Sequence, residues 1–206
     1  MLVIPNVTAD RFKREARTLL RTLLLLLLMP TAVAVAQNPP SPAAVVPDQN
    51  PLTGHSKFLY GGLQKMLLAS AEIMPEGNYS FKPTDEVRSF GQIVGHVADA
   101  QYIFCSAVLG EKNPAPGVEK TKTSKADLIA ALKEAFAYCN KAHDSVTDAS
   151  AAQTVKMMGG DWPKLSTLTV NQVHGALHYG NIVTYLRMKD IVPPSSDPEF
   201  MKQLRK

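Results

Sequence analysis

The chain of 206 residues is 45% hydrophobic and 19% charged, and its mean hydropathy is near zero. This length suits one domain with a hydrophobic core, and the composition excludes a disordered chain, a collagen-like fibre and a multi-span membrane protein. Two cysteines exclude a disulfide scaffold, and the formal charge of +4 falls to +1 without residues 1–36, so no clustered basic surface for nucleic acid is expected.

The first 36 residues have the three parts of a secretory signal peptide. Basic residues lie between positions 11 and 21, six leucines follow at Leu23–Leu28, and Ala34-Val35-Ala36 forms an A-x-A cleavage pattern. The alternative is an uncleaved anchor, although an apolar stretch of 18 residues with a proline inside is at the lower limit for a membrane span. Both interpretations place the body of the protein outside the cytoplasm, in the periplasm or the extracellular space.

Residues 37–50 are predicted to form a proline-rich linker, and residues 51–206 a helical domain. Apolar residues recur at helical spacing in four stretches of roughly 20 residues, and no segment shows the period of a strand. Long loops over 74–88, 110–123 and 147–168 join these stretches. The pattern predicts an all-α four-helix bundle with helices over about Thr53–Ile73, Ser89–Leu109, Ser124–Val146 and Thr169–Lys189.

Capping residues mark the boundaries of these predicted helices. Ser89 begins a capping-box pattern, and Gly110 ends the same helix. Ser124 and Thr169 are the predicted caps of the third and fourth helices.

Polar side chains occupy positions where the second and fourth helices are predicted to face the core. His96 falls inside the apolar arc of its helix. His174, His178, Asn181 and Tyr185 form one stripe at i, i+4, i+7 and i+11, with apolar residues on both sides. Each buried imidazole or amide without a hydrogen-bond partner would cost roughly 1–3 kcal/mol, so the stripe must be satisfied in some way.

Two interpretations of these histidines stay open at this point. They are either core groups bonded to one another and to water, or ligands of one metal ion, because neutral imidazole binds zinc, nickel and iron well. The segment His174–His178 has Gly175 in place of the glutamate of a zinc protease, so no peptidase is predicted. Of the other histidines, His55 is expected to be an ordinary exposed residue, and His143 a cation that suits a helix C-terminus.

Three segments together resemble the DinB-like (damage-inducible B) family of metalloenzymes. They are Met74–Thr84, Val87–Ala100 and the stretch from His174 through Asn181 and Tyr185 to Ser196. The resemblance implies an up-down-down-up bundle and a divalent ion, such as zinc, nickel, iron or manganese, held by His96, His174 and His178. Characterised relatives include thiol-dependent transferases, and many members have no known reaction. The better-known members are cytoplasmic, so the predicted secretion signal of this chain departs from them.

The resemblance and the residue types together predict an exported metal-dependent enzyme that activates water or a small thiol for hydrolysis or thiol transfer. Asn181 and Tyr185 would line the pocket or simply pack, and Asp99 would orient His96 or be solvated. The alternatives are a non-catalytic binder of a metal or small ligand, and an interaction module with a polar seam. A small-molecule partner is expected, nucleic acid and stable membrane insertion after cleavage are not, and a homodimer is left open.

The two cysteines lie at similar heights in the second and third predicted helices. Cys105 is 16 residues beyond Ser89, and Cys139 is 15 residues beyond Ser124. If those helices run parallel, as the resemblance implies, a disulfide is within reach, whereas an antiparallel pair would separate the thiols by about 16 Å. Two buried free thiols are the preferred interpretation, and the bridge is the alternative.

Overall fold

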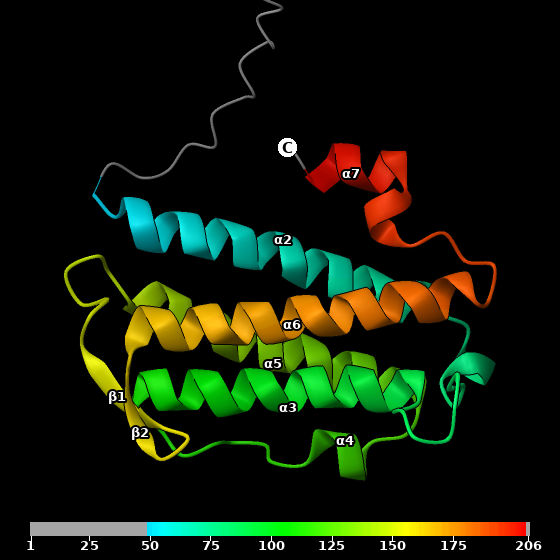
Figure 1. The fold of residues 1–206 in the computed structure, drawn as a ribbon, viewed down its shortest axis with the longest axis horizontal. Coiled ribbons are helices and arrows are strands. Elements are labelled where there is room, and N and C mark those ends of the chain that lie inside the picture. The colour runs from blue at the N-terminus through cyan, green and yellow to red at the C-terminus, as the bar shows by residue number, and fades with distance from the viewer. Residues whose placement is uncertain (1–48, 205–206) are drawn as a thin grey trace, which may run out of the picture. The chain divides into compact units, whose positions relative to one another are not determined.

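A computed structural model describes residues 49–204, so the predicted signal peptide and nearly all of the predicted linker lie outside the described residues. The four long helices are α2 (Pro51–Ile73), α3 (Phe90–Leu109), α5 (Lys125–Ser145) and α6 (Lys164–Arg187), and they lie side by side (Figure 1). The described part adds the short helices α4 (Val118–Thr121) and α7 (Pro198–Leu204), 3-10 turns at Glu76–Asn78 and Pro194–Ser196, and strands β1 (Thr154–Met157) and β2 (Gly160–Pro163). The prediction of a mostly helical domain is confirmed. Within residues 49–204, none of the helices has both the length and the hydropathy that a membrane span requires.

The predicted caps of α3 and α5 are present. Ser89 Oγ accepts a hydrogen bond from Gln92 N (3.2 Å), and Gln92 Oε1 accepts one from Ser89 N (2.8 Å), which completes the capping box. Gly110 ends α3 with a φ of 71°, a left-handed conformation that glycine adopts without strain. Ser124 Oγ accepts from Asp127 N (3.1 Å) at the start of α5.

The predicted start of α6 at Thr169 is wrong by five residues. The helix begins at Lys164, directly after Pro163, and it ends at Arg187. Its first amides are satisfied by a loop rather than by a capping side chain, because Lys164 N donates to Gln153 O (2.8 Å) and Leu165 N donates to Ala151 O (3.1 Å). A cap made by backbone from a preceding loop leaves no signature in the local sequence.

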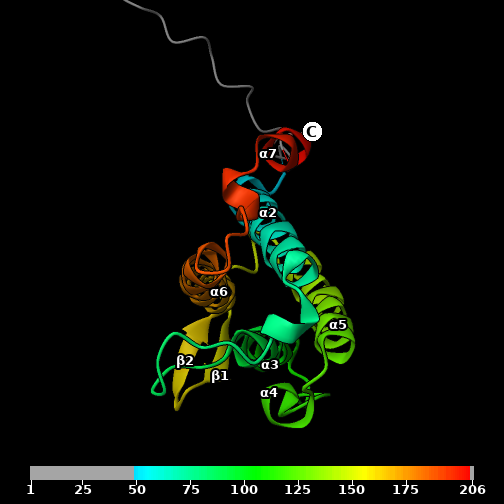
Figure 2. The ribbon, with the colours of Figure 1, turned by 90° about the vertical axis from the view of Figure 1, so that its right-hand side faces the viewer.

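The expectation that no strand occurs is also wrong. Strands β1 and β2 pair in antiparallel fashion, and Met158 and Gly159 form the turn with φ values of 50° and 79°. Two strands of four residues are too short to show a clear alternation of polar and apolar side chains. The hairpin packs beside α3 and α6 (Figure 2), where Met157 joins Ala100 and Phe104 in a small apolar cluster.

The main core fills the space between the four long helices. Its largest fully buried side chains include Tyr60 and Leu67 of α2, Phe90 of α3, Phe136 of α5 and Leu186 of α6. This core extends through all four helices, so it defines one helical body within the described residues.

The cysteines form a disulfide between α3 and α5, contrary to the preferred interpretation of two free thiols. Cys105 and Cys139 have their Cα atoms 5.1 Å apart, and both side chains are fully buried. Helices α3 and α5 lie side by side and begin at the same end (Figure 1). The similar distance of each cysteine from its helix cap therefore brings the two sulfurs together.

The predicted core face of α6 is displaced from the observed one. Val173 and Leu177 are 54% and 66% exposed, although apolar residues were expected to flank a buried polar stripe. The buried positions include Leu168, Asn171 and Gly175. Asparagine and glycine on the core face made the hydrophobic pattern of this helix point in the wrong direction.

His143 differs most from its prediction. It is 4% exposed, and its ring stacks on Tyr60 with the ring centres 4.1 Å apart. Burial lowers the pKa of His143 to about 4, with a further contribution from the positive charge of Lys57. The side chain is therefore neutral at pH 7 and does not act as a cation at the helix C-terminus. His55 is exposed, as expected.

Candidate metal centre

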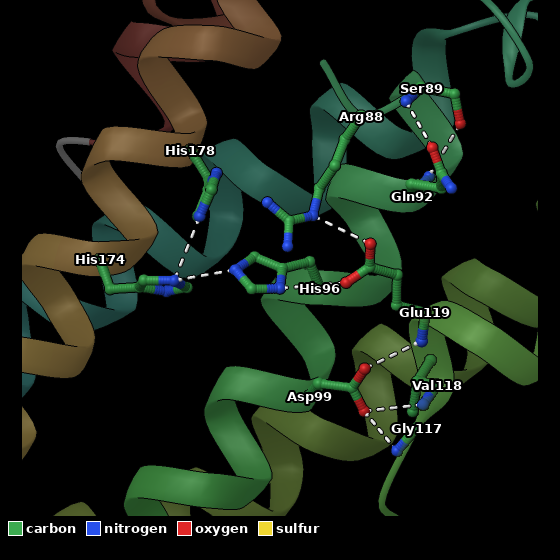
Figure 3. A network of polar contacts seen from close by, with 10 residues as sticks. All are labelled: Arg88, Ser89, Gln92, His96, Asp99, Gly117, Val118, Glu119, His174 and His178. Atoms are coloured by element: carbon green, nitrogen blue, oxygen red, sulfur yellow. Dashed lines mark hydrogen bonds and ion pairs between the residues drawn. The ribbon is translucent and has the colours of Figure 1, made fainter. Parts of the chain in front are cut away.

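Three histidines from α3 and α6 converge on one point (Figure 3). His96 Nε2 and His174 Nε2 are 3.1 Å apart, and His178 Nε2 is 3.1 Å from the same atom of His174. One ring nitrogen from each residue lies within 4.8 Å of those of the other two, and all three side chains are half-buried. The sequence spacing explains half of this arrangement, because residues 174 and 178 are one helical turn apart on one face.

A glycine beside His96, Gly95, lets the short helix α4 approach α3 closely. A Cβ atom on Gly95 would lie only 2.7 Å from Glu119 Cα, a distance that a side chain cannot adopt. Only glycine therefore allows α4 to lie against α3 next to His96. This close approach brings the side chain of Glu119 to the histidine cluster.

Glu119 links His96 to a cation. Its Oε2 is 3.2 Å from His96 Nδ1, and its Oε1 accepts a hydrogen bond of 2.9 Å from Arg88 Nε. A carboxylate on Nδ1 favours the tautomer that carries its proton there, so that Nε2 faces the cluster as an acceptor. Neither Glu119 nor Arg88 was predicted, because 23 residues separate Glu119 from His96 and only the tertiary fold joins them.

Asp99 neither contacts His96 nor is simply solvated, the two roles predicted for it. Its carboxylate accepts hydrogen bonds from the backbone N–H groups of Gly117 (2.9 Å), Val118 (2.7 Å) and Glu119 (2.9 Å). These bonds fix the first turn of α4 against α3. Asp99 therefore holds the backbone of Glu119, and Glu119 in turn contacts His96 (Figure 3).

Tyr185 and Asn181, the other two predicted pocket residues, lie in different surroundings. Tyr185 is buried, and its hydroxyl donates a hydrogen bond of 2.7 Å to the carbonyl oxygen of Arg88. Asn181 is exposed on α6. Tyr185 therefore fixes the backbone from which Arg88 projects, whereas Asn181 makes no side-chain hydrogen bond within residues 49–204.

The electrostatic surroundings keep the histidines of α6 neutral. Burial is the main cause that lowers the pKa of His174, and it lowers the pKa of His178 to about 4. The positive charge of Arg88 lowers both further. Neutral imidazole is the form that binds a metal ion, so this environment suits a ligand set.

The donor set fits a divalent ion. If each ring carries its proton on Nδ1, three Nε2 lone pairs face one another, and at 3.1 Å such an arrangement needs a shared proton or a cation between them. Across the described residues, the buried Nδ1 atoms of His174 and His178 have no hydrogen-bond partner, so His96 is the one histidine of the cluster whose Nδ1 contacts a carboxylate. Three neutral imidazoles are an established ligand set for zinc, and they suit other transition metals too.

The comparisons with known proteins agree with the fold. The model of the DinB superfamily matches residues 60–182, which include all three histidines and Glu119. A DinB-like protein from Bacillus cereus is similar in structure, with a TM-score of 0.59 and 13% identity over 66% of this chain and 91% of that one. A DinB-like protein from Bacillus subtilis has a TM-score of 0.55 and 19% identity over 66% of this chain and 92% of its own. Among proteins with curated descriptions none matches. Because the family model covers more than half of the sequence and confirms the predicted resemblance, this chain belongs to the DinB superfamily.

Proposed function

We propose that this protein is an exported, divalent-metal-dependent enzyme that activates water or a small thiol for hydrolysis or thiol transfer. His96, His174 and His178 would hold the ion. The observation that carries the proposal is the convergence of three half-buried Nε2 atoms from two helices.

The chemistry follows from the charge of the ligands. Three neutral histidines leave the charge of a divalent ion uncompensated, and such an ion lowers the pKa of water or a thiol toward neutrality. Glu119 holds the proton of His96 on Nδ1, which keeps Nε2 available. Asp99 holds Glu119 in place through the backbone of α4.

Export is part of the same proposal. The leucine run Leu23–Leu28 and the pattern Ala34–Ala36 support it, and so does the Cys105–Cys139 disulfide, since disulfides persist mainly in oxidising compartments. We expect N-terminal sequencing of the exported protein to begin at Gln37. A mature protein that retains Leu23–Leu28 would favour a membrane anchor instead.

We also propose the up-down-down-up order of the four long helices. Lys125 Nζ at the start of α5 donates to Met74 O after the end of α2 (2.8 Å), which supports opposite directions for these two helices. Gln172 Nε2 near the start of α6 donates to Ser56 Oγ near the start of α2 (2.8 Å), which supports the same direction for this pair.

Metal analysis of the purified mature protein tests the ligand set. We expect about one equivalent of a transition metal in the wild type and a loss of at least roughly tenfold in His96→Ala and His178→Ala. His55→Ala is the matched control, because His55 is exposed at the start of α2, and it should keep the metal. Equal metal content in all four proteins would contradict the proposal.

Turnover separates an enzyme from a simple binder. The metal-loaded wild type should accelerate the reaction of a small thiol with a test electrophile, or the hydrolysis of a test ester. A protein that holds its metal and accelerates neither class of reaction would favour the non-catalytic binder.

A further inference from the structure

Arg88 lies beside the histidine cluster with most of its hydrogen-bonding capacity unused. Its Nε donates to Glu119 (2.9 Å), while within residues 49–204 its two terminal nitrogens have no hydrogen-bond partner. Figure 3 shows the guanidinium between Glu119 and His178, with the terminal nitrogens on the side of the histidines. The side chain is 44% exposed, so a small molecule can reach it.

The position of Arg88 is fixed from two sides. The hydroxyl of Tyr185 holds its carbonyl oxygen (2.7 Å), and Glu119 holds its Nε. The next residue, Ser89, caps α3. A guanidinium fixed in this way presents two parallel N–H groups, the geometry that recognises a carboxylate in bidentate fashion.

The positive charges around Arg88 favour the binding of an anion beside it. An arginine is permanently positive, and the three histidines would hold a second cation beside it. Two cations so close repel each other unless an anion lies between or next to both. Glu119 neutralises part of this charge but is bonded to Arg88 through Nε alone, so the terminal nitrogens remain available.

Further basic residues line a hollow next to Arg88. A hollow of about 830 Å³ shares Arg88 and Glu119 with the site and is also lined by Lys82, Lys120 and Lys122. Lys82 is paired with Asp85 (3.0 Å) and Arg88 with Glu119, so Lys120 and Lys122 leave the hollow with an excess of positive charge, which attracts small anions.

We propose that Arg88 binds a carboxylate of the substrate, and that the compound activated at the histidine cluster is therefore a small carboxylate-bearing molecule. This inference rests on the proposed function. It adds a substrate class to it, and it makes Arg88 a specificity-determining residue.

The test uses two thiols of similar size and the protein loaded with Co²⁺, whose absorption reports thiolate binding. The probes are mercaptoacetate, which carries a carboxylate, and 2-mercaptoethanol, which is neutral. We expect the wild type to bind mercaptoacetate at least roughly tenfold more tightly, because a hydrogen bond between two charged groups contributes that much or more. This preference should disappear in Arg88→Gln and persist in part in Arg88→Lys.

The affinity for 2-mercaptoethanol shows whether each variant keeps an intact site, and Arg187→Gln, at the far end of α6, is the matched control. An equal preference for mercaptoacetate in the wild type and in Arg88→Gln would overturn the inference while leaving the proposed function standing. A wild type without preference would overturn it as well. A wild type that takes up no Co²⁺ would reject the proposed function, and this inference with it.

Discussion

Two polar clusters lie between α3 and α6, and they differ in how their hydrogen bonds are satisfied. In the first, Gln101 and Asn171 exchange hydrogen bonds of 2.8 and 3.2 Å, and Tyr60 donates to the same oxygen of Gln101 (2.8 Å). All three side chains are at most 1% exposed. In the second, about one turn away, the Nε2 atom of His174 lies 3.1 Å from those of both His96 and His178, while the buried Nδ1 atoms of His174 and His178 have no partner in the described structure.

The difference separates a structural polar group from a functional one. A fully buried and fully bonded amide pair specifies how two helices pack. Half-buried histidines that converge and keep buried ring nitrogens without partners are consistent with a metal site. By this criterion Gln101 and Asn171 belong to the fold, and the three histidines belong to the site.

The largest expected effect is that of removing the disulfide, which lies against the first cluster. Asn171 Nδ2 lies 3.4 Å from Cys139 Sγ and 3.7 Å from Cys105 Sγ, so the bridge packs against the amide pair. For a loop of about 35 residues, the chain-entropy model gives a loss of about 3–4 kcal/mol in Cys105→Ala/Cys139→Ala. Urea unfolding would measure it. A loss below about 1 kcal/mol would show that the bridge does not constrain the unfolded chain.

The pH dependence of stability should report His143, which stacks on Tyr60 at the edge of the first cluster. Burial lowers its pKa from 6.5 to about 4, so between these values the unfolded chain binds a proton that the folded protein does not. The free energy of unfolding should therefore rise from pH 4 to 6.5, with about 3 kcal/mol of this rise due to His143.

The matched variant for this measurement is His143→Phe, which keeps an aromatic ring on Tyr60. His174 and His178 are present in both metal-free proteins, so their contributions cancel in the difference. Parallel stability curves for the two proteins from pH 4 to 6.5 would show that His143 does not titrate as the structure indicates.

Two leucine substitutions compare the clusters directly. Asn171→Leu leaves the buried amide nitrogen of Gln101 without an acceptor, and it should destabilise the protein by about 2 kcal/mol. His174→Leu in the metal-free protein should have a smaller effect, because this imidazole has a buried nitrogen with no partner in the described structure. The reverse order of the two free energies of unfolding would contradict the distinction between the clusters.

The smallest expected effect concerns the support of the site. Gly95→Ala must displace the backbone of Glu119, since the new Cβ would lie 2.7 Å from its Cα. We expect weaker contact between Glu119 and His96 and a metal affinity lower by about tenfold. Competition with a chelator would measure it. Gly62→Ala is the control, because a Cβ there meets no atom within 4 Å.

Local signals in the sequence predicted most of the fold. Ser89, Gly110 and Ser124 carry caps formed by their own side chain or conformation, and each is found as predicted. The start of α6 depends on the backbone of the preceding loop instead, and the start of α2 on a distant partner. Asp148 accepts from the amides of Leu52 (3.0 Å) and Thr53 (2.8 Å) across nearly 100 residues, so no local pattern could show it.

The same division holds for the site. His174 and His178 are paired by helical spacing, His96 is a candidate because it falls inside the apolar arc of its helix, and the resemblance joins all three in one site. Glu119, Arg88 and the true role of Asp99 depend on the approach of α4 to α3 at Gly95. Periodicity describes one helix at a time, and it cannot show which loop lies against that helix.

X-ray absorption spectroscopy of the zinc-loaded protein tests the central claim most directly. We predict three imidazole nitrogens at about 2.0–2.1 Å from the metal, with the outer-shell scattering that histidine rings produce. Loss of one imidazole in His174→Ala would assign the signal to the cluster. A spectrum dominated by carboxylate oxygen or sulfur, or three imidazoles retained in His174→Ala, would contradict the account.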